Sequence, residues 1–203
     1  MKQFWTEKHK LNDVAHLTGS DLYAINTYME LPLMPDMDVL NIGVGMGKCT
    51  RQLKELTNNV YVLDICQEAI DKVKDVIIKG YLTPQSLPKY KFDLIMSHLV
   101  SQHINKEELT NHIEYGINAL SLQGEMVIQI AVPINRNEVD YSDASAGAGS
   151  IKYTIDEVVE LINIYGGRLT RLKFYERFLQ YNMDWYIFHI KRINMIHIEE
   201  PEQ

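Results

Sequence analysis

The segment VLNIGVGMGKCT, residues 39–50, constrains the fold of this chain more than any other part of its sequence. Gly43, Gly45 and Gly47 occupy alternate positions, directly after an apolar run and directly before a stretch with helical spacing. Glycine permits a sharp backbone turn and lets a ligand approach the main chain closely. A strand, a glycine loop and a helix in this order predict the nucleotide-binding edge of an α/β fold. A plain tight turn is the alternative interpretation of the glycines.

The same alternation of short apolar runs and helical stretches continues along the chain. Continuous apolar strands separated by helices are typical of a parallel sheet that is covered on both faces. Asn105 with Glu108, and Thr154 with Glu157, have the spacing of helix capping boxes. Two long β-rich runs close the chain and can pair as an antiparallel hairpin. The predicted strands are 37–43, 59–65, 76–82, 92–98, 125–132, 168–180 and 183–193, and the first two helices after the glycines are 47–57 and 67–75.

The organisation predicted from this pattern is one main domain with two additions. Residues 1–36 form an N-terminal helical extension that could fold over the site as a lid, 37–193 form the domain, and 194–203 are a polar tail. Within the domain, residues 135–150 are polar and rich in Gly, Ala and Ser, and we interpret them as a mobile loop.

Charge and composition argue against several classes of partner. The net charge is −7 and the basic residues are not clustered, which is unlike a surface that binds nucleic acid. We find neither a secretory signal nor an apolar run of about 18 residues, so we expect a cytoplasmic protein with no membrane partner. Cys49 and Cys66 are interpreted as reduced, buried thiols, and we expect no metal site.

The second informative position is Asp64, which lies at the end of the predicted strand 59–65, just before Ile65, and follows Gly43 by 21 residues. An acidic side chain at the tip of the second strand can accept hydrogen bonds from both ribose hydroxyls of a nucleoside. The alternative interpretation is that Asp64 caps the following helix. The glycine spacing is GxGxG, with Lys48 where the dinucleotide fingerprint has its third glycine. This difference argues against an NAD-dependent oxidoreductase.

Together, the ordered segments VLNIGVGMG, VYVLD, YKFDLIMSHLVSQHI and ALSLQGEMVIQI resemble the motifs of class I S-adenosylmethionine-dependent methyltransferases. The resemblance covers roughly residues 37–193 and includes the closing hairpin. It implies a Rossmann-like, doubly wound sheet of seven strands, mostly parallel with an antiparallel C-terminal strand, and S-adenosylmethionine as cofactor. The cofactor-binding positions that it implies are Asn41, Gly43, Gly45, Gly47, Asp64, Ile65, Thr83 and Ser97.

The resemblance has two departures, because Asn41 and Thr83 stand where the family often has a carboxylate. These departures leave a second interpretation open, in which the chain is a non-catalytic module that retains the fold. The segment after the fourth strand lacks both Asn-Pro-Pro-Tyr and an acidic metal pair, which implies a metal-independent mechanism. His98 and His103 are the candidate catalytic bases, since a histidine can take a proton near neutral pH. Their alternative roles are a solvent-facing or supporting histidine for His98 and a packing residue for His103.

The acceptor is predicted only by class: a hydroxyl or amine of a small molecule or of a sugar. Aromatic residues of the extension and the mobile loop could line the pocket for the acceptor, or could simply be packing residues. A second aromatic set lies in the closing hairpin, and we interpret it as sheet core or as the surface of a homodimer. The first set is Trp5, Tyr23, Tyr28 and Tyr141, and the second is Phe174, Tyr175, Phe178, Tyr181, Trp185, Tyr186 and Phe188.

Overall fold

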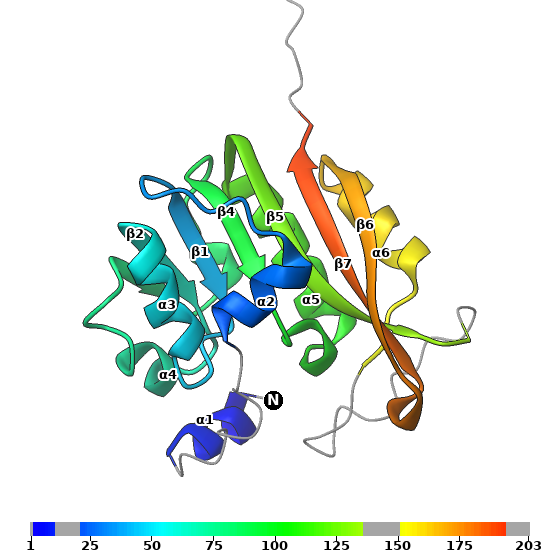
Figure 1. The fold of residues 1–203 in the computed structure, drawn as a ribbon, viewed down its shortest axis with the longest axis horizontal. Helices are drawn as coiled ribbons and strands as arrows, with labels where there is room; N and C mark the ends of the chain where they lie inside the picture. Colours follow the sequence, from blue (N-terminus) through cyan, green and yellow to red (C-terminus); the bar gives the residue numbers. More distant parts are fainter. Residues whose placement is uncertain (1, 11–20, 136–150, 194–203) are drawn as a thin grey trace, which may run out of the picture.

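A computed structural model of the chain describes residues 2–10, 21–135 and 151–193. Its centre is a seven-stranded sheet with the order β3-β2-β1-β4-β5-β7-β6 (Figure 1). Strands β1 to β5 pair in parallel, whereas β7 is antiparallel to both of its neighbours, β5 and β6. The predicted fold class is therefore confirmed. The strands are β1 (Asp38–Ile42), β2 (Asn59–Leu63), β3 (Lys79–Tyr81), β4 (Phe92–Ser97), β5 (Leu120–Pro133), β6 (Gly167–Phe178) and β7 (Met183–Arg192).

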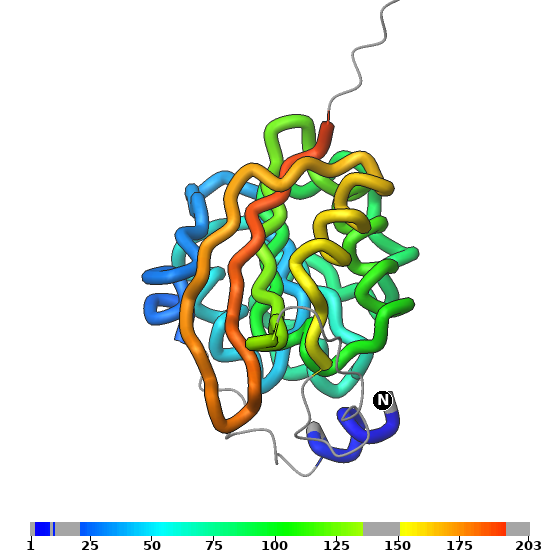
Figure 2. The backbone as a smooth tube through the Cα atoms, turned by 90° about the vertical axis from the view of Figure 1, so that its right-hand side faces the viewer, coloured from blue at the N-terminus to red at the C-terminus, as the bar shows by residue number. Residues whose placement is uncertain are grey.

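Helices cover both faces of the sheet, as Figure 2 shows when the sheet is viewed from its β6 edge. Helices α2 and α3 pack on one face and α5 and α6 on the other, while α1 lies beyond the carboxyl ends of β1 and β4 (Figure 1). Because successive strand residues point to opposite faces, a sheet covered twice needs apolar residues at nearly every position. The helices are α1 (Lys2–Lys10), α2 (Leu22–Met29), α3 (Lys48–Leu56), α4 (Gln67–Asp71), α5 (Lys106–Ala119) and α6 (Ile155–Ile164).

Helix α2 belongs to the hydrophobic core of the main sheet, although we assigned it to the extension. Its residues Leu22, Ile25 and Met29 are buried against strand residues such as Leu94 and Ile187. The boundary at residue 36 stays a prediction, but the core itself begins with α2.

Local signals in the sequence account for several of the helix ends. Both predicted capping boxes are present: Asn105 accepts from the backbone N–H of Glu108 at the start of α5, and Thr154 accepts from that of Glu157 at α6. The predicted helix 67–75 is shorter in the structure, because α4 ends at Asp71 and the chain continues in turns. There the guanidinium of Arg51 donates to the carbonyl of Lys72 and pairs with Asp75.

The closing hairpin is confirmed, with the 3-10 turn η4 (Leu179–Tyr181) and a left-handed Asn182 between β6 and β7. Most of the predicted mobile loop, from residue 136 to residue 150, lies outside the described residues, as does the polar tail 194–203. Within the described part of the chain, no helix is both long enough and apolar enough to cross a membrane.

Candidate functional site

The glycine loop follows β1 at the carboxyl edge of the sheet, between β2 and β4. Gly43 has a φ of +83° and Gly47 a φ of +87°, values that L side chains rarely adopt. A Cβ at Gly43 would lie 2.3 Å from Cγ2 of Val100, in the segment that follows β4. A Cβ at Gly47 would lie 2.4 Å from Cγ1 of Val73. Both positions therefore favour glycine, because the backbone is left-handed and because it packs closely against Val100 and Val73.

Asp64 lies directly after β2 and joins two segments of the site through its carboxylate. One oxygen accepts from the backbone N–H of Val44 at 2.8 Å, and the other accepts from that of Cys66 at 2.9 Å. Helix α4 has Cys66 rather than Asp64 at its N-cap position, so the alternative capping role of Asp64 is wrong. These two hydrogen bonds from backbone N–H groups fix the carboxylate beside the glycine loop, which is the position that the ribose assignment requires.

Three other predicted cofactor positions have their own places in the structure. Asn41 is 2% exposed, and its amide donates to the hydroxyl of Thr50 on α3 at 3.0 Å, which ties β1 to that helix. Ile65 is partly buried and packs against the apolar side chains around α4. Thr83 is exposed at the N-cap of the 3-10 turn η2 (Pro84–Ser86), and its carbonyl accepts from the hydroxyl of Ser86.

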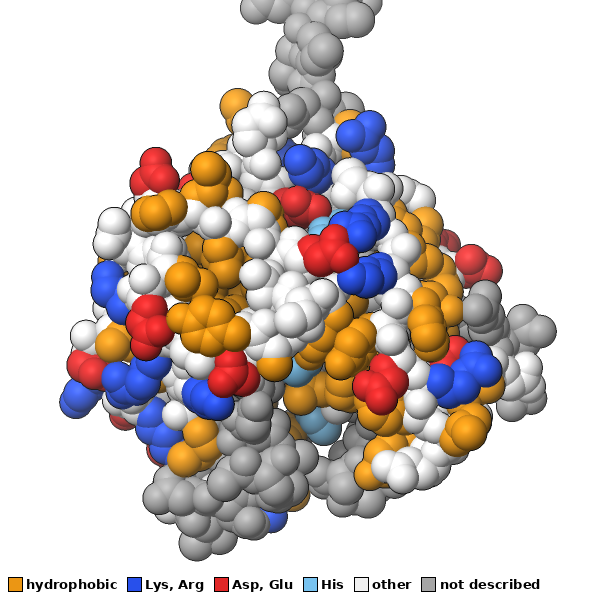
Figure 3. All heavy atoms as spheres, in the orientation of Figure 1, with side chains coloured by type: hydrophobic (Ala, Val, Ile, Leu, Met, Phe, Trp, Pro, Cys, Tyr) orange, Lys and Arg blue, Asp and Glu red, His pale blue; other side chains and the backbone are white. Residues whose placement is uncertain are grey.

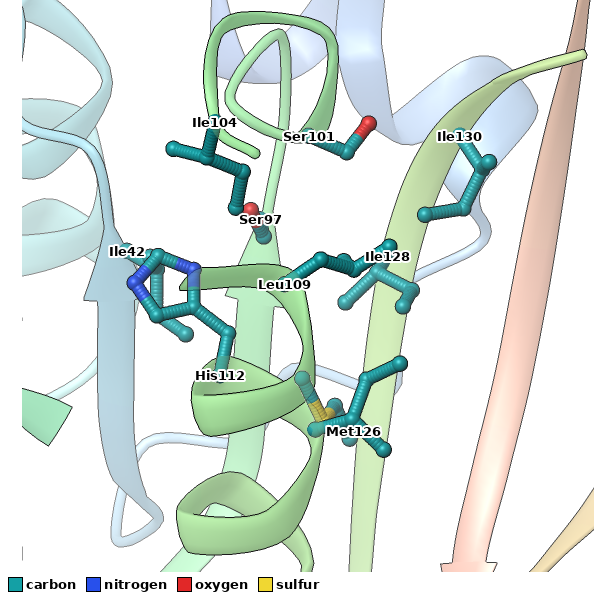
Figure 4. A pocket seen from close by; sticks show the side chains of 10 residues that line it. Ile42, Ser97, Ser101, Ile104, Leu109, His112, Met126, Ile128 and Ile130 are labelled. Carbon is teal, nitrogen blue, oxygen red and sulfur yellow. The ribbon is translucent and has the colours of Figure 1, made fainter. Parts of the chain in front are cut away.

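Ser97 is buried at the end of β4 and lines a small cavity beneath α5 (Figure 4). His112 extends from α5 toward the same cavity, where Ile42 of β1 also lies (Figure 4). The cavity volume of about 10 Å³ is about that needed for one water molecule. The cavity is therefore too small for a methyl acceptor.

His98 directly follows β4 and belongs to an aromatic cluster that the chain assembles from three other elements. Its Nε2 lies 2.5 Å from the hydroxyl oxygen of Tyr28 on α2, and its ring stands edge-on to Trp185 of β7. The ring of Tyr28 stacks on that of Tyr175 of β6, with centroids 3.7 Å apart. Burial lowers the pKa of His98 to about 4 and raises that of Tyr28. The pair is therefore neutral at pH 7, and one proton lies between the two heavy atoms.

His103 occupies the 3-10 turn η3 (Ser101–His103), and its surroundings differ from those of His98. Its ring stands edge-on to Trp5 of α1, with centroids 5.2 Å apart, and burial lowers its pKa to about 4. Trp5 also packs against the apolar cluster of α4. Helix α1 thus joins the segment after β4 to the segment after β2, as a covering element would.

The segment that holds the two histidines is fixed to β5 by one buried side chain. The amide oxygen of Gln129 accepts from the backbone N–H of Leu99 at 2.9 Å, and the hydroxyl of Ser101 donates to the backbone carbonyl of Gln129. Leu99 has a φ of +58°, which is uncommon outside glycine. The turn after β4 is thus pinned in a sharp conformation that directs His98 toward α2.

The other predicted aromatic residues separate into two groups. Tyr23 is exposed and donates to Glu55, away from His98, while the side chain of Tyr186 is buried on the opposite face with α5 and α6. Tyr141 lies outside the described residues. We predicted that Tyr175 and Trp185 lie in the sheet core or on a dimer surface, and Tyr175 packs against the core cluster that includes α2. That both also lie beside His98 depends on which strands are neighbours in the sheet.

A family model described as "Methyltransferase domain" matches residues 40–115, which run from β1 into α5. A solved S-adenosylmethionine-dependent methyltransferase from Mesorhizobium loti superposes with a TM-score of 0.66, at 16% identity, over 87% of this chain and 100% of that one. The chain has the class I methyltransferase fold. No curated protein sequence matches it.

Two further solved structures have the same fold. One is a SAM-dependent methyltransferase from Leishmania major, with a TM-score of 0.65, 17% identity and coverage of 91% of this chain and 73% of that one. The other is the 1,6-didemethyltoxoflavin-N1-methyltransferase from Burkholderia thailandensis, with a TM-score of 0.67, 11% identity and coverage of 95% and 87%. The resemblance read from the sequence is confirmed at the level of the matched methyltransferase domain and of the fold. The family model does not support the NAD-dependent oxidoreductase.

Proposed function

We propose that the chain transfers the methyl group of S-adenosylmethionine to a hydroxyl or amine of a small molecule or sugar. The observation that supports this most is the meeting of two sets of residues at one edge of the sheet. Ile42 of β1 pairs with Ser97 of β4, so Gly43 and His98 follow on neighbouring strands. The glycine loop and Asp64 lie on one side of this point, and the His98–Tyr28 pair lies on the other.

The residues present fit the cofactor. The glycine loop turns sharply at the end of β1 through left-handed Gly43, Gly45 and Gly47, and Asp64 holds a carboxylate at the tip of β2. Gly43, Gly45 and Gly47 would lie along the methionine and ribose portions, and Asp64 would accept from the ribose hydroxyls. When bound, S-adenosylmethionine supplies a methyl group that is electrophilic because it is attached to a sulfonium.

His98 takes the role of proton acceptor in this proposal. A neutral imidazole is required, and the lowered pKa keeps His98 neutral throughout the physiological range. A pKa near 4 makes it a weak base, but an attacking hydroxyl becomes a strongly acidic oxonium as the new bond forms, so a weak base suffices. Tyr28 fixes the imidazole ring through the 2.5 Å contact and can pass the proton to it. Positioning of the acceptor supplies much of the remaining acceleration.

The first experiment is calorimetric titration of the protein with S-adenosylmethionine, S-adenosylhomocysteine and NAD in parallel. We expect the two adenosyl sulfur compounds to bind and NAD not to bind. Methyl transfer is then measured by mass spectrometry with hydroxylated and amine-bearing acceptors. Binding of NAD alone would refute the proposal.

The two histidines provide a matched pair of variants. We expect His98→Gln to lower kcat by about 100-fold while the affinity for S-adenosylmethionine is retained, because the proton acceptor is lost. His103→Gln should change kcat by much less, since His103 contacts Trp5 of the covering helix. Equal losses in the two variants would contradict the role of His98.

A second function, a cofactor-binding module without catalysis, is favoured by Asn41 and Thr83. The amide of Asn41 donates to Thr50 inside the core, and Thr83 is exposed without a carboxylate. Binding of S-adenosylmethionine with no transfer to any acceptor would support this function. Two predictions from the sequence stand beside it: a homodimer, which light scattering tests, and a metal-independent reaction, which assays with and without chelator test. Among the described residues, no His, Cys, Asp or Glu side chains form a group of three or more that could hold a metal ion.

A further inference from the structure

Four aromatic side chains form a wall beside His98, on the face of the sheet that α2 covers. They are Tyr28, Tyr175, Phe178 and Trp185, and we call them the aromatic wall. They come from α2, β6 and β7, so the wall exists only in the folded chain. Figure 3 shows histidine side chains within a hollow of this face, bordered by hydrophobic side chains.

The rings of the wall share nearly one orientation. The planes of Tyr28 and Tyr175 differ by 20°, and those of Tyr175 and Trp185 differ by 22°. Phe178 supports Trp185 from the hairpin end, with centroids 4.4 Å apart. Rings in this arrangement form a stack, and a planar ligand can continue a stack because offset stacking is a favoured arrangement of π-systems. A row of this kind differs from an aromatic cage, whose rings surround a cation from several sides.

One buried polar atom of the aromatic wall, the indole Nε1 of Trp185, has no hydrogen-bond partner among the described residues. A buried donor without an acceptor costs free energy, and such groups in native proteins call for an explanation. An acceptor atom on a bound molecule would satisfy it. The ring of Trp185 stands edge-on to that of His98, with centroids 6.2 Å apart. One bound ligand could therefore contact both the indole Nε1 and the proposed base His98.

We propose that the methyl acceptor is a neutral, planar aromatic molecule that lies against the aromatic wall. This proposal rests on the methyltransferase function proposed above. A carbonyl oxygen or ring nitrogen of the acceptor receives the hydrogen bond of Trp185, and a neighbouring hydroxyl or ring N–H lies at His98. The single unpaired donor and the neutral base of this wall match a molecule with few polar groups. A sugar presents many hydroxyls that would need partners, and a cationic amine would meet an N–H donor instead of an acceptor.

The test compares binding of small probes to the full chain saturated with S-adenosylhomocysteine, measured by calorimetry. The probes are 8-hydroxyquinoline, which has a ring nitrogen next to its hydroxyl, phenol, cyclohexanol and methyl glucoside. We expect 8-hydroxyquinoline to bind most tightly, phenol next, and the two non-aromatic alcohols least. Tighter binding of methyl glucoside or cyclohexanol than of both aromatic probes, or no binding of any aromatic probe at millimolar concentration, would overturn the proposal.

Two variants separate the hydrogen bond from the stacking. Trp185→Phe keeps a ring and removes the N–H, so it should weaken 8-hydroxyquinoline about tenfold and phenol hardly at all. Tyr175→Leu should weaken both aromatic probes, because the middle ring of the row is lost. Tyr181→Phe, at an exposed position of the same hairpin, is the matched control and should change neither. Equal weakening of the two probes in Trp185→Phe would contradict the hydrogen bond.

Affinity for S-adenosylhomocysteine, measured in each variant, reports on folding and distinguishes the two proposals. Retained cofactor binding with the wrong probe order refutes the aromatic acceptor and leaves the methyltransferase function intact. Absence of cofactor binding in the parent chain refutes the proposed function. Probe binding that still depends on Trp185 would then support an aromatic ligand of another kind.

Discussion

Replacing Gly43 by alanine should destabilise the chain by about 1.5–3.5 kcal/mol. The φ of +83° costs an L residue roughly 1–2 kcal/mol. The new Cβ would also lie 2.3 Å from Cγ2 of Val100, which forces that side chain off its rotamer at a cost of about 0.5–1.5 kcal/mol. For a chain of this length, each 1 kcal/mol lowers the Tm by about 2–4 °C. The same collision displaces the glycine loop, so S-adenosylmethionine should bind more weakly as well.

Gly166 provides the control that separates the two costs. It has a φ of +73°, but nothing lies within 4 Å of the position of a Cβ. Gly166→Ala should therefore show only the backbone cost, about 1–2 kcal/mol. Combining Gly43→Ala with Val100→Ala should recover the steric part, seen as a coupling energy in a double-mutant cycle. Urea unfolding followed by circular dichroism measures all four proteins. If Gly43→Ala is no more destabilising than Gly166→Ala, or Val100→Ala restores nothing, the steric reasoning is wrong.

Three further predictions concern charged groups. Asp64→Asn places a side-chain amide against two backbone N–H donors. It should weaken S-adenosylmethionine binding, measured by calorimetry, by about 1.5–3 kcal/mol. Unchanged affinity would contradict the ribose assignment. Burial lowers the pKa of His112 from 6.5 to about 4. The stability that the buried neutral imidazole contributes is therefore complete above pH 6.5 and is lost as the pH falls toward 4. His112→Leu should therefore reduce the loss of stability between pH 7.5 and pH 5 by about 2 kcal/mol, measured by urea unfolding, and an identical pH dependence would refute this. The carboxylate of Glu30 pairs with Lys173 and Arg171, which lower its pKa to about 2. Its contribution to stability is therefore present above pH 4.5 and lost as the pH falls through 2. Glu30→Gln should lower the Tm at pH 7 more at low salt than at high salt, and an equal effect at both salt concentrations would argue against an ionic contact.

The proposed cofactor-binding half of the candidate site was largely predictable because it is local in sequence. Gly43 and Gly47 follow a strand and precede a helix, and no tertiary information is needed to see that the backbone must turn there. Asp64 was found by its distance along the chain. What the sequence did not show is that its carboxylate also binds the backbone of Val44 and Cys66, which makes it a structural residue of the loop as well.

The acceptor half could not be predicted, because it is assembled from residues far apart in the chain. Tyr28 meets His98 across 70 positions, and Trp185 reaches the same place from the last strand. Which side of the sheet Trp185 faces depends on the register of β7 against β5, where it pairs with Ala131. A shift of one residue would turn its ring to the other face.

By itself the sequence determined the α/β alternation, the glycine turn, both capping boxes and the closing hairpin. Each depends on contacts within a few residues, where backbone geometry and hydrophobic period act directly. Only the tertiary structure decided that α2 belongs to the core, that Tyr28 lies against His98, and that burial lowers the pKa of that histidine. These properties depend on desolvation and on packing between distant segments, which are set when the sheet closes under its helices.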